Sequence, residues 1–450
     1  MCGFFCTNLP NIPLNLHDVE SRGWATQSFS HSRYTAVQSQ LPCYTGKLDF
    51  DHYECADYIF SFTGEIYNTP KEYATDTEYM RSRAIRADYS DLNGAWAFVL
   101  YNKQTQTITY GVDPVGQVPL FVYAFGGITL SNTLPSMVHQ VGAKLDPQTL
   151  ARWQTAKHYT SRQTQWLGIV QAEPGVIQTV NSLGVTVNSV RVPVRRHNTV
   201  ENPVTVLEQI QSDYTTVLDS EHIVSGGIDS TVLAHTWCSS DNRGLDHVGK
   251  DWVSNTLGRF HQLPVTVHEI SEQTWCNAVE QFVQETYTVP YTWSWVGYYL
   301  LGYYTQANVL YTGEGADEIF GGYPGYSSGG TPYSVNPEHD ELRTAVKNPK
   351  LVDQAVFIPV ACTGSNLALG CHTVEPRNPY LDHRIIYNDH YVPQLNKPDL
   401  TDRFLHAFGD SRLQPKQGFG GFPDEFSKSI TDQSWPVGPW RLAEKLFSHL

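Results

Sequence analysis

The sequence predicts two domains of different fold class, an α+β domain of stacked antiparallel sheets with flanking helices and then an α/β domain with a parallel sheet. A chain of 450 residues is too long for one small core, so two domains are the natural expectation. Short alternating apolar segments fill the first 190 residues, whereas strands and helices alternate after residue 203. We therefore place the domains at 1–195 and 200–450.

Strand patterns dominate the N-terminal part. Apolar and polar residues alternate in short segments that Gly, Pro, Asn and Asp separate, as is typical of strands joined by turns. Helical periodicity is rarer there and covers 76–86 and 146–157. The strand segments are 58–62, 95–101, 106–110 and 120–123. Strands with segregated helices predict stacked antiparallel sheets flanked by helices.

The C-terminal part alternates between helix and strand. Helical periodicity over 204–218 is followed by the strand Ile223-Val224, a glycine turn and a helix over 229–238. A second apolar strand, 309–311, again ends in a glycine-rich turn, which favours a parallel sheet covered by helices. The aromatic segment 293–304 could line a channel, but a buried packing helix before that second strand is the favoured interpretation.

Composition excludes several classes of protein. A net charge of −15 argues against binding nucleic acid through its phosphates. The eight cysteines form no CxxC pair, so no zinc site or redox dithiol is indicated. The N-terminus lacks a secretion signal, and the most apolar stretch, 293–304, is too short to span a bilayer. We expect a soluble cytoplasmic protein that contacts neither nucleic acid nor membrane.

The second residue is a cysteine. If Met1 is removed, Cys2 carries both a thiol and a free α-amine, whose pKa values are ordinarily about 8.5 and roughly 7.7–8.0. One residue then supplies a nucleophile and, directly or through a water, its general base. The alternative is a cysteine that merely follows Met1.

A glycine loop follows the first C-terminal strand. In Ser225-Gly226-Gly227-Ile228-Asp229-Ser230 the glycines allow a sharp turn, and backbone N–H groups at a helix N-terminus can bind an anion. Asp229 would repel a bare phosphate, so its presence fits a bound magnesium ion. The alternative is an ordinary strand–turn–helix connection.

An acidic loop follows the second strand. Gly313-Glu314-Gly315-Ala316-Asp317-Glu318 places three carboxylates after an apolar strand, and ligands bind at the carboxyl ends of parallel strands. Both loops could therefore face one crevice and hold magnesium with a substrate phosphate. The alternative is a solvated acidic loop. Lys416, in a later glycine-rich loop, would alone be interpreted as a surface charge.

These segments together resemble glutamine-dependent asparagine synthetases, a class II amidotransferase family. Their order over about 420 residues makes the resemblance specific. The matching segments are Cys2-Gly3, 62–68 (similar to NGEIYN), 74–78, 112–120, 225–230, 313–323, 380–382 and the loop around Lys416. The resemblance implies an N-terminal-nucleophile hydrolase fold, then an adenine-nucleotide-hydrolase-like fold.

The resemblance implies a glutaminase site in the first domain. Cys2 would attack the side-chain amide of glutamine, release ammonia and leave a thioester for hydrolysis to glutamate. Arg33 and Asp76, assisted by Glu65, would hold the α-carboxylate and α-amine of glutamine. The Gly64 N–H would be one oxyanion donor. Thr63 stands where the family has an asparagine donor.

The resemblance implies ATP-dependent adenylation of a carboxylate in the second domain, most simply the side chain of aspartate. Channelled ammonia would then give asparagine, glutamate, AMP and pyrophosphate. Asp229 and Asp317 would hold Mg²⁺. Glu314 would orient or deprotonate the amine, and Lys416 would stabilise negative charge. The implied nucleotide and pyrophosphate contacts are Ile223, Ser225, Gly226, Gly227, Asp229, Ser230, Val248, Thr312 and Gly313.

Four departures from the family pattern keep alternatives open. Thr63 has a shorter donor than asparagine, so we expect slower glutamine hydrolysis that Thr63→Asn accelerates. The RGPD motif appears as 22–25, and Val112 replaces an arginine. The segment between Cys238 and His268 is short, which slightly favours a different carboxylate acceptor. A nucleotide-binding regulator that has lost catalysis is a third hypothesis, and a homodimer stays open.

Overall fold

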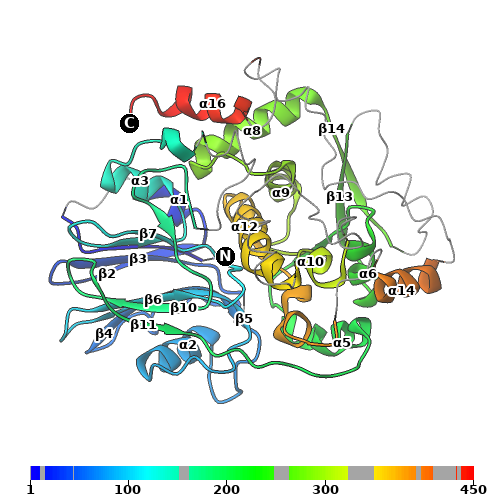
Figure 1. The fold of residues 1–450 in the computed structure, drawn as a ribbon, viewed down its shortest axis with the longest axis horizontal. Helices are drawn as coiled ribbons and strands as arrows, with labels where there is room; N and C mark the ends of the chain where they lie inside the picture. The colour runs from blue at the N-terminus through cyan, green and yellow to red at the C-terminus, as the bar shows by residue number, and fades with distance from the viewer. Residues whose placement is uncertain are drawn as a thin grey trace.

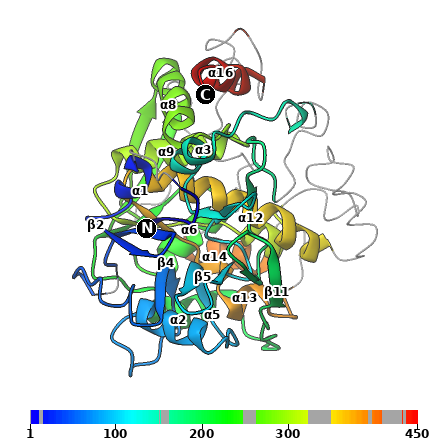
Figure 2. The ribbon, with the colours of Figure 1, turned by 90° about the vertical axis from the view of Figure 1, so that its left-hand side faces the viewer.

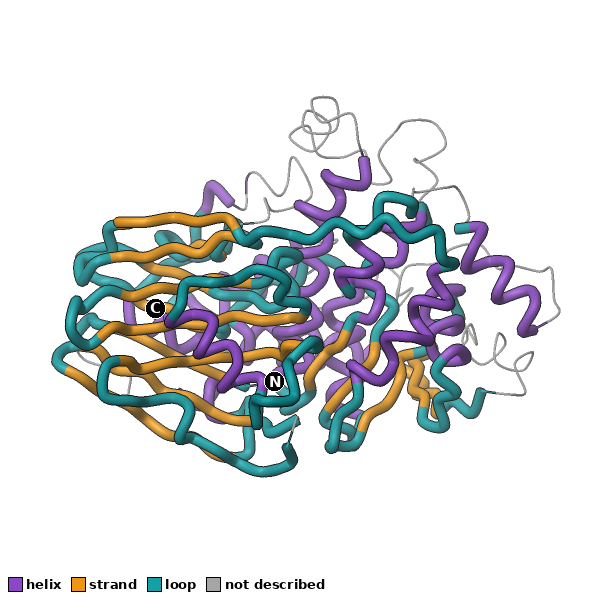
Figure 3. Tube along the Cα trace, turned by 90° about the horizontal axis from the view of Figure 1, so that it is seen from below, coloured by secondary structure: helices purple, strands orange, loops and turns teal. Residues whose placement is uncertain are grey.

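Three sheets organise the molecule. The computed structural model describes residues 2–10, 16–43, 45–149, 151, 162–247, 263–322, 349–391, 397–408, 432 and 437–450. Two antiparallel sheets lie at one end of the molecule and a parallel sheet at the other (Figures 1 and 3). This arrangement confirms the predicted fold class.

The two antiparallel sheets stack face to face. The first has the order β2-β3-β1-β8-β7-β9 and the second the order β11-β10-β6-β5-β4. Alternating apolar residues such as Phe4, Phe60 and Phe98 fill the core between them, because successive side chains of a strand point to opposite faces. The strands are β1 (Gly3–Thr7), β2 (Ala25–His31), β3 (Tyr34–Gln40), β4 (Tyr58–Ile66), β5 (Gly94–Asn102), β6 (Ile108–Val112), β7 (Phe121–Tyr123), β8 (Thr129–Ser131), β9 (Val170–Gln171), β10 (Val176–Val180) and β11 (Thr186–Arg191).

Helices cover the outer faces of this stack. Figures 1 and 2 show α1 (His17–Glu20) and α3 (Pro135–Val141) over the first sheet and α2 (Asp76–Ile85) over the second. Thr75 caps α2 by accepting the backbone N–H of Glu78, which fixes the start of the helix at Asp76. Most of the predicted helix 146–157 lies outside the described residues.

The parallel sheet has the order β14-β13-β12-β15-β16, so the first two strands of the prediction lie side by side at its centre. Its strands are β12 (Ser220–Ile223), β13 (Asn242–His247), β14 (Thr266–Ile270), β15 (Val309–Tyr311) and β16 (Glu375–Arg377). The surrounding helices are α5 (Pro203–Ile210), η1 (Gln211–Tyr214), α6 (Ile228–Thr236), α8 (Glu272–Thr286), α9 (Trp293–Tyr304), α10 (Ala316–Phe320), α12 (Pro349–Gly370), η3 (Pro379–Leu381), α13 (His383–Ile386), α14 (Pro398–Phe408) and α16 (Val437–Phe447).

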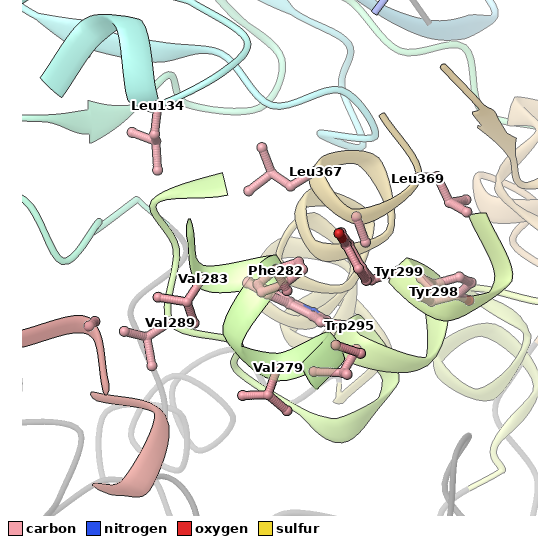
Figure 4. Close-up of a cluster of buried hydrophobic side chains, with 14 of the residues drawn as sticks. Leu134, Val279, Phe282, Val283, Val289, Trp295, Tyr298, Tyr299, Leu367 and Leu369 are labelled. Atoms are coloured by element: carbon pink, nitrogen blue, oxygen red, sulfur yellow. The ribbon is translucent and has the colours of Figure 1, made fainter. Parts of the chain in front are cut away.

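The aromatic segment 293–304 forms the buried helix α9, as predicted. Figure 4 shows Phe282 of α8, Trp295 of α9 and Leu367 of α12 directed into one core. Helices α9 and α12 approach closely because Gly364 has no side chain: a Cβ there would lie 1.9 Å from Trp295 Nε1.

The two parts of the chain are joined by buried polar contacts. Arg22 is 2% exposed and donates to the side-chain and main-chain oxygens of Asn366 on α12 at 3.4 and 3.1 Å. A Cβ on Gly370 would lie 2.4 Å from the Arg22 guanidinium. The arginine of segment 22–25 therefore serves packing between the two parts.

Candidate active site

Cys2 lies at the entry to β1 and is anchored through its carbonyl. Thr63 Oγ1 and Asn132 Nδ2 donate to that carbonyl at 2.7 and 2.9 Å. The backbone N–H of Leu41 donates to Cys2 Sγ at 3.4 Å. Burial raises the pKa of the Cys2 thiol to about 11. Attack by this thiol therefore requires a base nearby.

The oxyanion candidates Thr63 and Gly64 follow one another on β4. The bond from the Thr63 hydroxyl to the Cys2 carbonyl occupies its one proton, so a role as oxyanion donor would require this bond to break. Gly64 has a φ of +105°, and a Cβ there would lie 1.9 Å from the Ala95 carbonyl oxygen. The backbone therefore requires glycine at this position.

Two acidic residues predicted to bind glutamine lie in the same buried cluster as Cys2. Glu65 and Asp76 are both 6% exposed, and the Asp76 carboxylate accepts the backbone N–H of Thr77 at 2.7 Å. Burial, followed by the charge of Glu375, raises the pKa of Asp76 to about 7. The charge of Asp76 in turn contributes to the raised pKa of Cys2, because the two groups are close.

Arg33 does not join this cluster. It is exposed in the turn between β2 and β3, whereas the opposite end of β3 leads to Leu41 beside Cys2. The seven residues of β3 separate Arg33 from Leu41, which places the two about 26 Å apart at the usual rise per residue. The structure thus contradicts the predicted carboxylate clamp, because the β2–β3 turn carries Arg33 to the far edge.

The arginine that does enter the cluster is Arg377 of β16, which we did not predict. Its guanidinium is in salt-bridge contact with Glu65, lies 3.2 Å from Glu375 and donates to the Tyr214 carbonyl at 2.7 Å. Cys43 Sγ donates to Glu375 at 3.7 Å. The matching segment 380–382 begins three residues later, and nothing local in the sequence indicated that this arginine pairs with β4.

The predicted phosphate loop connects β12 to α6. Ser230 Oγ accepts the backbone N–H of Ser225 at 3.1 Å, and Ser225 Oγ accepts that of Gly227 at 3.4 Å. Gly226 has a φ of +75°, and Ile223, at the end of β12, is buried. The turn thus has the conformation of a loop that presents N–H groups and hydroxyls at a helix N-terminus.

The acidic loop connects β15 to α10 and faces the phosphate loop. A Cβ on Gly313 would lie 3.1 Å from the Ser230 backbone nitrogen, so the two loops are in contact there. Thr312 Oγ1 accepts the Glu314 N–H at 3.2 Å, and the Tyr298 hydroxyl donates to the Glu314 carboxylate at 2.5 Å. The prediction that both loops face one crevice agrees with this geometry.

The two predicted metal ligands converge on one cation, and that cation is a lysine. Lys397 Nζ is in salt-bridge contact with both Asp229 and Asp317, and the Lys397 side chain is 6% exposed. Burial opposes the charged form of Lys397, but the two carboxylates outweigh it and raise its pKa. Gly322 leaves the necessary space, because a Cβ there would lie 2.4 Å from Lys397 Cε.

This pair of carboxylates fits Mg²⁺, which takes one or two carboxylates together with substrate phosphate oxygens. Over the described ranges, no group of three or more His, Cys, Asp or Glu residues converges on one point. The pair is therefore suited to a metal that arrives with a phosphate ligand. The predicted contacts Val248 and Lys416 lie outside the described residues and stay predictions.

The described helices include none that is long and apolar enough to cross a membrane.

Two family models match the chain: a glutamine amidotransferase domain over residues 50–190 and an asparagine synthase domain over residues 222–332. Each match lies within one of the two structural parts.

Two curated relatives align over most of this chain. The asparagine synthetase [glutamine-hydrolyzing] of Rattus norvegicus is 23% identical over 424 residues, which cover 83% of this chain and 73% of the relative. The asparagine synthetase [glutamine-hydrolyzing] 1 of Bacillus subtilis is also 23% identical, over 78% of this chain and 62% of the relative. A solved glutamine phosphoribosylpyrophosphate amidotransferase from B. subtilis aligns with 13% identity over 54% of this chain and 65% of that one, with a TM-score of 0.29. The chain therefore matches a glutamine amidotransferase model in its N-terminal part and an asparagine synthase model in its C-terminal part, and it resembles the glutamine-hydrolysing asparagine synthetases over most of its length.

Proposed function

We propose that this protein hydrolyses glutamine at Cys2 and uses the ammonia, with ATP, to convert a carboxylate into an amide. Aspartate is the proposed acceptor and asparagine the product. The observation that carries the proposal is the convergence of Asp229 and Asp317 on one cation, at adjoining loops after β12 and β15. Carboxyl ends of parallel strands are where such sheets bind ligands.

In the proposed glutaminase step the processed Cys2 amine, whose pKa is ordinarily about 7.7–8.0, accepts the thiol proton directly or through water. The carboxylates of Glu65 and Asp76 bind the α-ammonium of glutamine. The Gly64 N–H stabilises the oxyanion. Water then cleaves the thioester to release glutamate.

We propose domain boundaries at 195 and 200, in the connection between β11 and α5.

In the proposed synthetase step the acceptor carboxylate attacks ATP, and pyrophosphate leaves. The hydroxyls of Ser225 and Ser230 and the N–H groups of their loop bind the pyrophosphate. Mg²⁺, held by Asp229 and Asp317, would neutralise its charge. Glu314 orients the ammonia that attacks the adenylate, and Lys416 stabilises the developing charge. All eight cysteines are free, which supports a reducing cytoplasm as the compartment.

The test is pyrophosphate release from full-length protein with ATP and Mg²⁺, with either glutamine or ammonium as nitrogen donor. Cys2→Ala should abolish the glutamine-driven amide and leave the ammonium-driven amide. Cys6→Ala is the matched control, because Cys6 is also buried on the N-terminal strand and burial raises its pKa to about 11 as well.

Each outcome has a distinct meaning. Aspartate-stimulated release supports the proposal as stated. Release with another acid alone would retain the amidotransferase and replace the acceptor. Absence of release with any acid would favour the nucleotide-binding regulator. Loss of the ammonium-driven product in Cys2→Ala would contradict two separate sites.

A further inference from the structure

Arg377 connects the two candidate sites through a single residue. It lies on β16, the edge strand of the parallel sheet, and its side chain leaves that sheet to reach Glu65 on β4, the edge strand of an antiparallel sheet. The Arg377 side chain is 1% exposed, so water does not screen this contact. It is thus a buried ion pair between the two structural parts.

The backbone of the same residue supports the acidic loop. Arg377 pairs with Tyr311 of β15, and its carbonyl accepts the backbone N–H of Thr312 at 2.9 Å. The Thr312 hydroxyl donates to Asn378 at 2.6 Å and accepts the Glu314 N–H. A displacement of β16 at this residue would therefore reach Glu314 through two consecutive hydrogen bonds.

Several acidic side chains surround Arg377. One guanidinium serves two carboxylates, those of Glu65 and Glu375, and Asp76 lies in the same cluster. Burial raises the pKa of Glu65, and Arg377 opposes that rise without cancelling it. An ammonium group bound at Glu65 would compete with the guanidinium for that carboxylate. Arg377 contacts both carboxylates in this structure, so loss of the Glu65 contact would leave a second arrangement in which Glu375 alone holds the guanidinium.

We propose that Arg377 couples the two sites, so that glutamine bound beside Glu65 and ATP bound beside the Thr312–Glu314 loop alter each other's affinity. The inference rests on the proposed function for the identity of the two ligands. Arg377 acts here as a positioning residue, since it contacts neither reacting group. Thermodynamic linkage requires that each ligand change the affinity of the other by the same factor.

The experiment measures that factor by calorimetry in full-length Cys2→Ala protein, which cannot consume glutamine. The dissociation constant of glutamine is determined without and with saturating ATP and Mg²⁺, in the absence of acceptor. We expect a change of about fivefold or more, the lower end of usual allosteric factors. In Cys2→Ala protein that also carries Arg377→Gln, the ratio of the two dissociation constants should be close to one, even if the affinity for glutamine itself changes.

Arg243→Gln is the matched control. Arg243 lies on β13 of the same sheet and binds Glu221 of β12 at 2.6 and 2.7 Å, within the C-terminal part alone. Arg243→Gln, added to the Cys2→Ala protein, should leave the ratio of the two dissociation constants unchanged. Arg377→Lys is a second variant, to be used if Arg377→Gln does not fold. Lysine keeps the charge but cannot serve Glu65, Glu375 and the Tyr214 carbonyl together, so its ratio should also fall toward one.

Two results would overturn the inference: an unchanged ratio in both Arg377 variants, or a ratio of one in the Cys2→Ala protein although both ligands bind. A loss of coupling in Arg243→Gln as well would also overturn it, because the effect would then not be specific to β16. If the Cys2→Ala protein binds glutamine but not ATP, or neither, the proposed function itself fails. That result is distinct from binding without coupling.

Discussion

Lys397→Met tests the interpretation of Asp229 and Asp317 as a cation site. The substitution removes a buried ammonium that contacts both carboxylates, which are themselves only 21% exposed. Removing one partner of a buried ion pair costs about 3–5 kcal/mol, because the charge that is left has no compensation. We expect a loss of unfolding free energy of that size when the protein is kept in EDTA.

Magnesium should restore part of this loss. In the variant the two carboxylates are available to the ion, and a ligand at a hundred times its dissociation constant stabilises the folded state by about 2.7 kcal/mol. The assay is urea unfolding of wild type and variant in EDTA and in excess Mg²⁺. Lys103→Met is the control, since its partner Glu54 is 41% exposed and such pairs contribute about 0–1 kcal/mol.

The reasoning fails if Lys397→Met costs less than about 1 kcal/mol in EDTA, because Lys397 would then not balance the two aspartates. It also fails if Mg²⁺ stabilises the variant no more than it stabilises wild type. In that case Asp229 and Asp317 would share a lysine without forming a metal site.

Three further outcomes are expected. Thr63→Val should lower kcat for glutamine hydrolysis less than about tenfold, because the Cys2 carbonyl keeps Asn132; a loss of about 10²–10³ would show that the hydroxyl is an oxyanion donor. Gly64→Ala should destabilise the fold by at least about 1–3 kcal/mol in urea unfolding, since φ is +105°; an unchanged midpoint would contradict the required backbone. Asp76 has a pKa of about 7 in the fold, so the stability it contributes is complete below about pH 4 and is lost as the pH rises through 7. Between pH 4.5 and 7 the free energy of unfolding of wild type should therefore fall by roughly 3 kcal/mol more than that of Asp76→Asn, since each pH unit contributes about 1.4 kcal/mol. Parallel curves of unfolding free energy against pH would refute the raised pKa of Asp76.

Local patterns predicted the elements whose formation depends on local sequence. The strand 58–62 lies within β4, the strand 309–311 is β15, and the aromatic segment 293–304 is α9. The helix over 204–218 was too long: α5 ends at Ile210 and the chain continues as a 3-10 turn. Tyr214 explains the difference, because its carbonyl accepts both Arg377 and the Tyr311 hydroxyl, and these tertiary contacts override helical periodicity.

The candidate site was predictable where topology alone brings residues together. Asp229 and Asp317 follow neighbouring parallel strands, so their convergence followed from the order of strands and turns. Arg377 and Lys397 have partners far away in sequence, and no periodicity or motif reports such a contact. The prediction for Arg33 was wrong for a related reason. Its position fits the order of the motifs, but it lies in the hairpin turn between β2 and β3, far from Cys2.

Helix α12 has a consequence for attempts to divide the protein. It belongs to the C-terminal part by sequence, yet its last two turns are held between Trp295 on one side and Arg22 on the other. Cutting the chain between β11 and α5 would remove Asn366 from the buried Arg22 guanidinium in one fragment and uncover the Arg22 side of α12 in the other. Fragments expressed apart should be poorly soluble, whereas coexpressed fragments should copurify. The two parts have different topologies, but each completes the packing of the other.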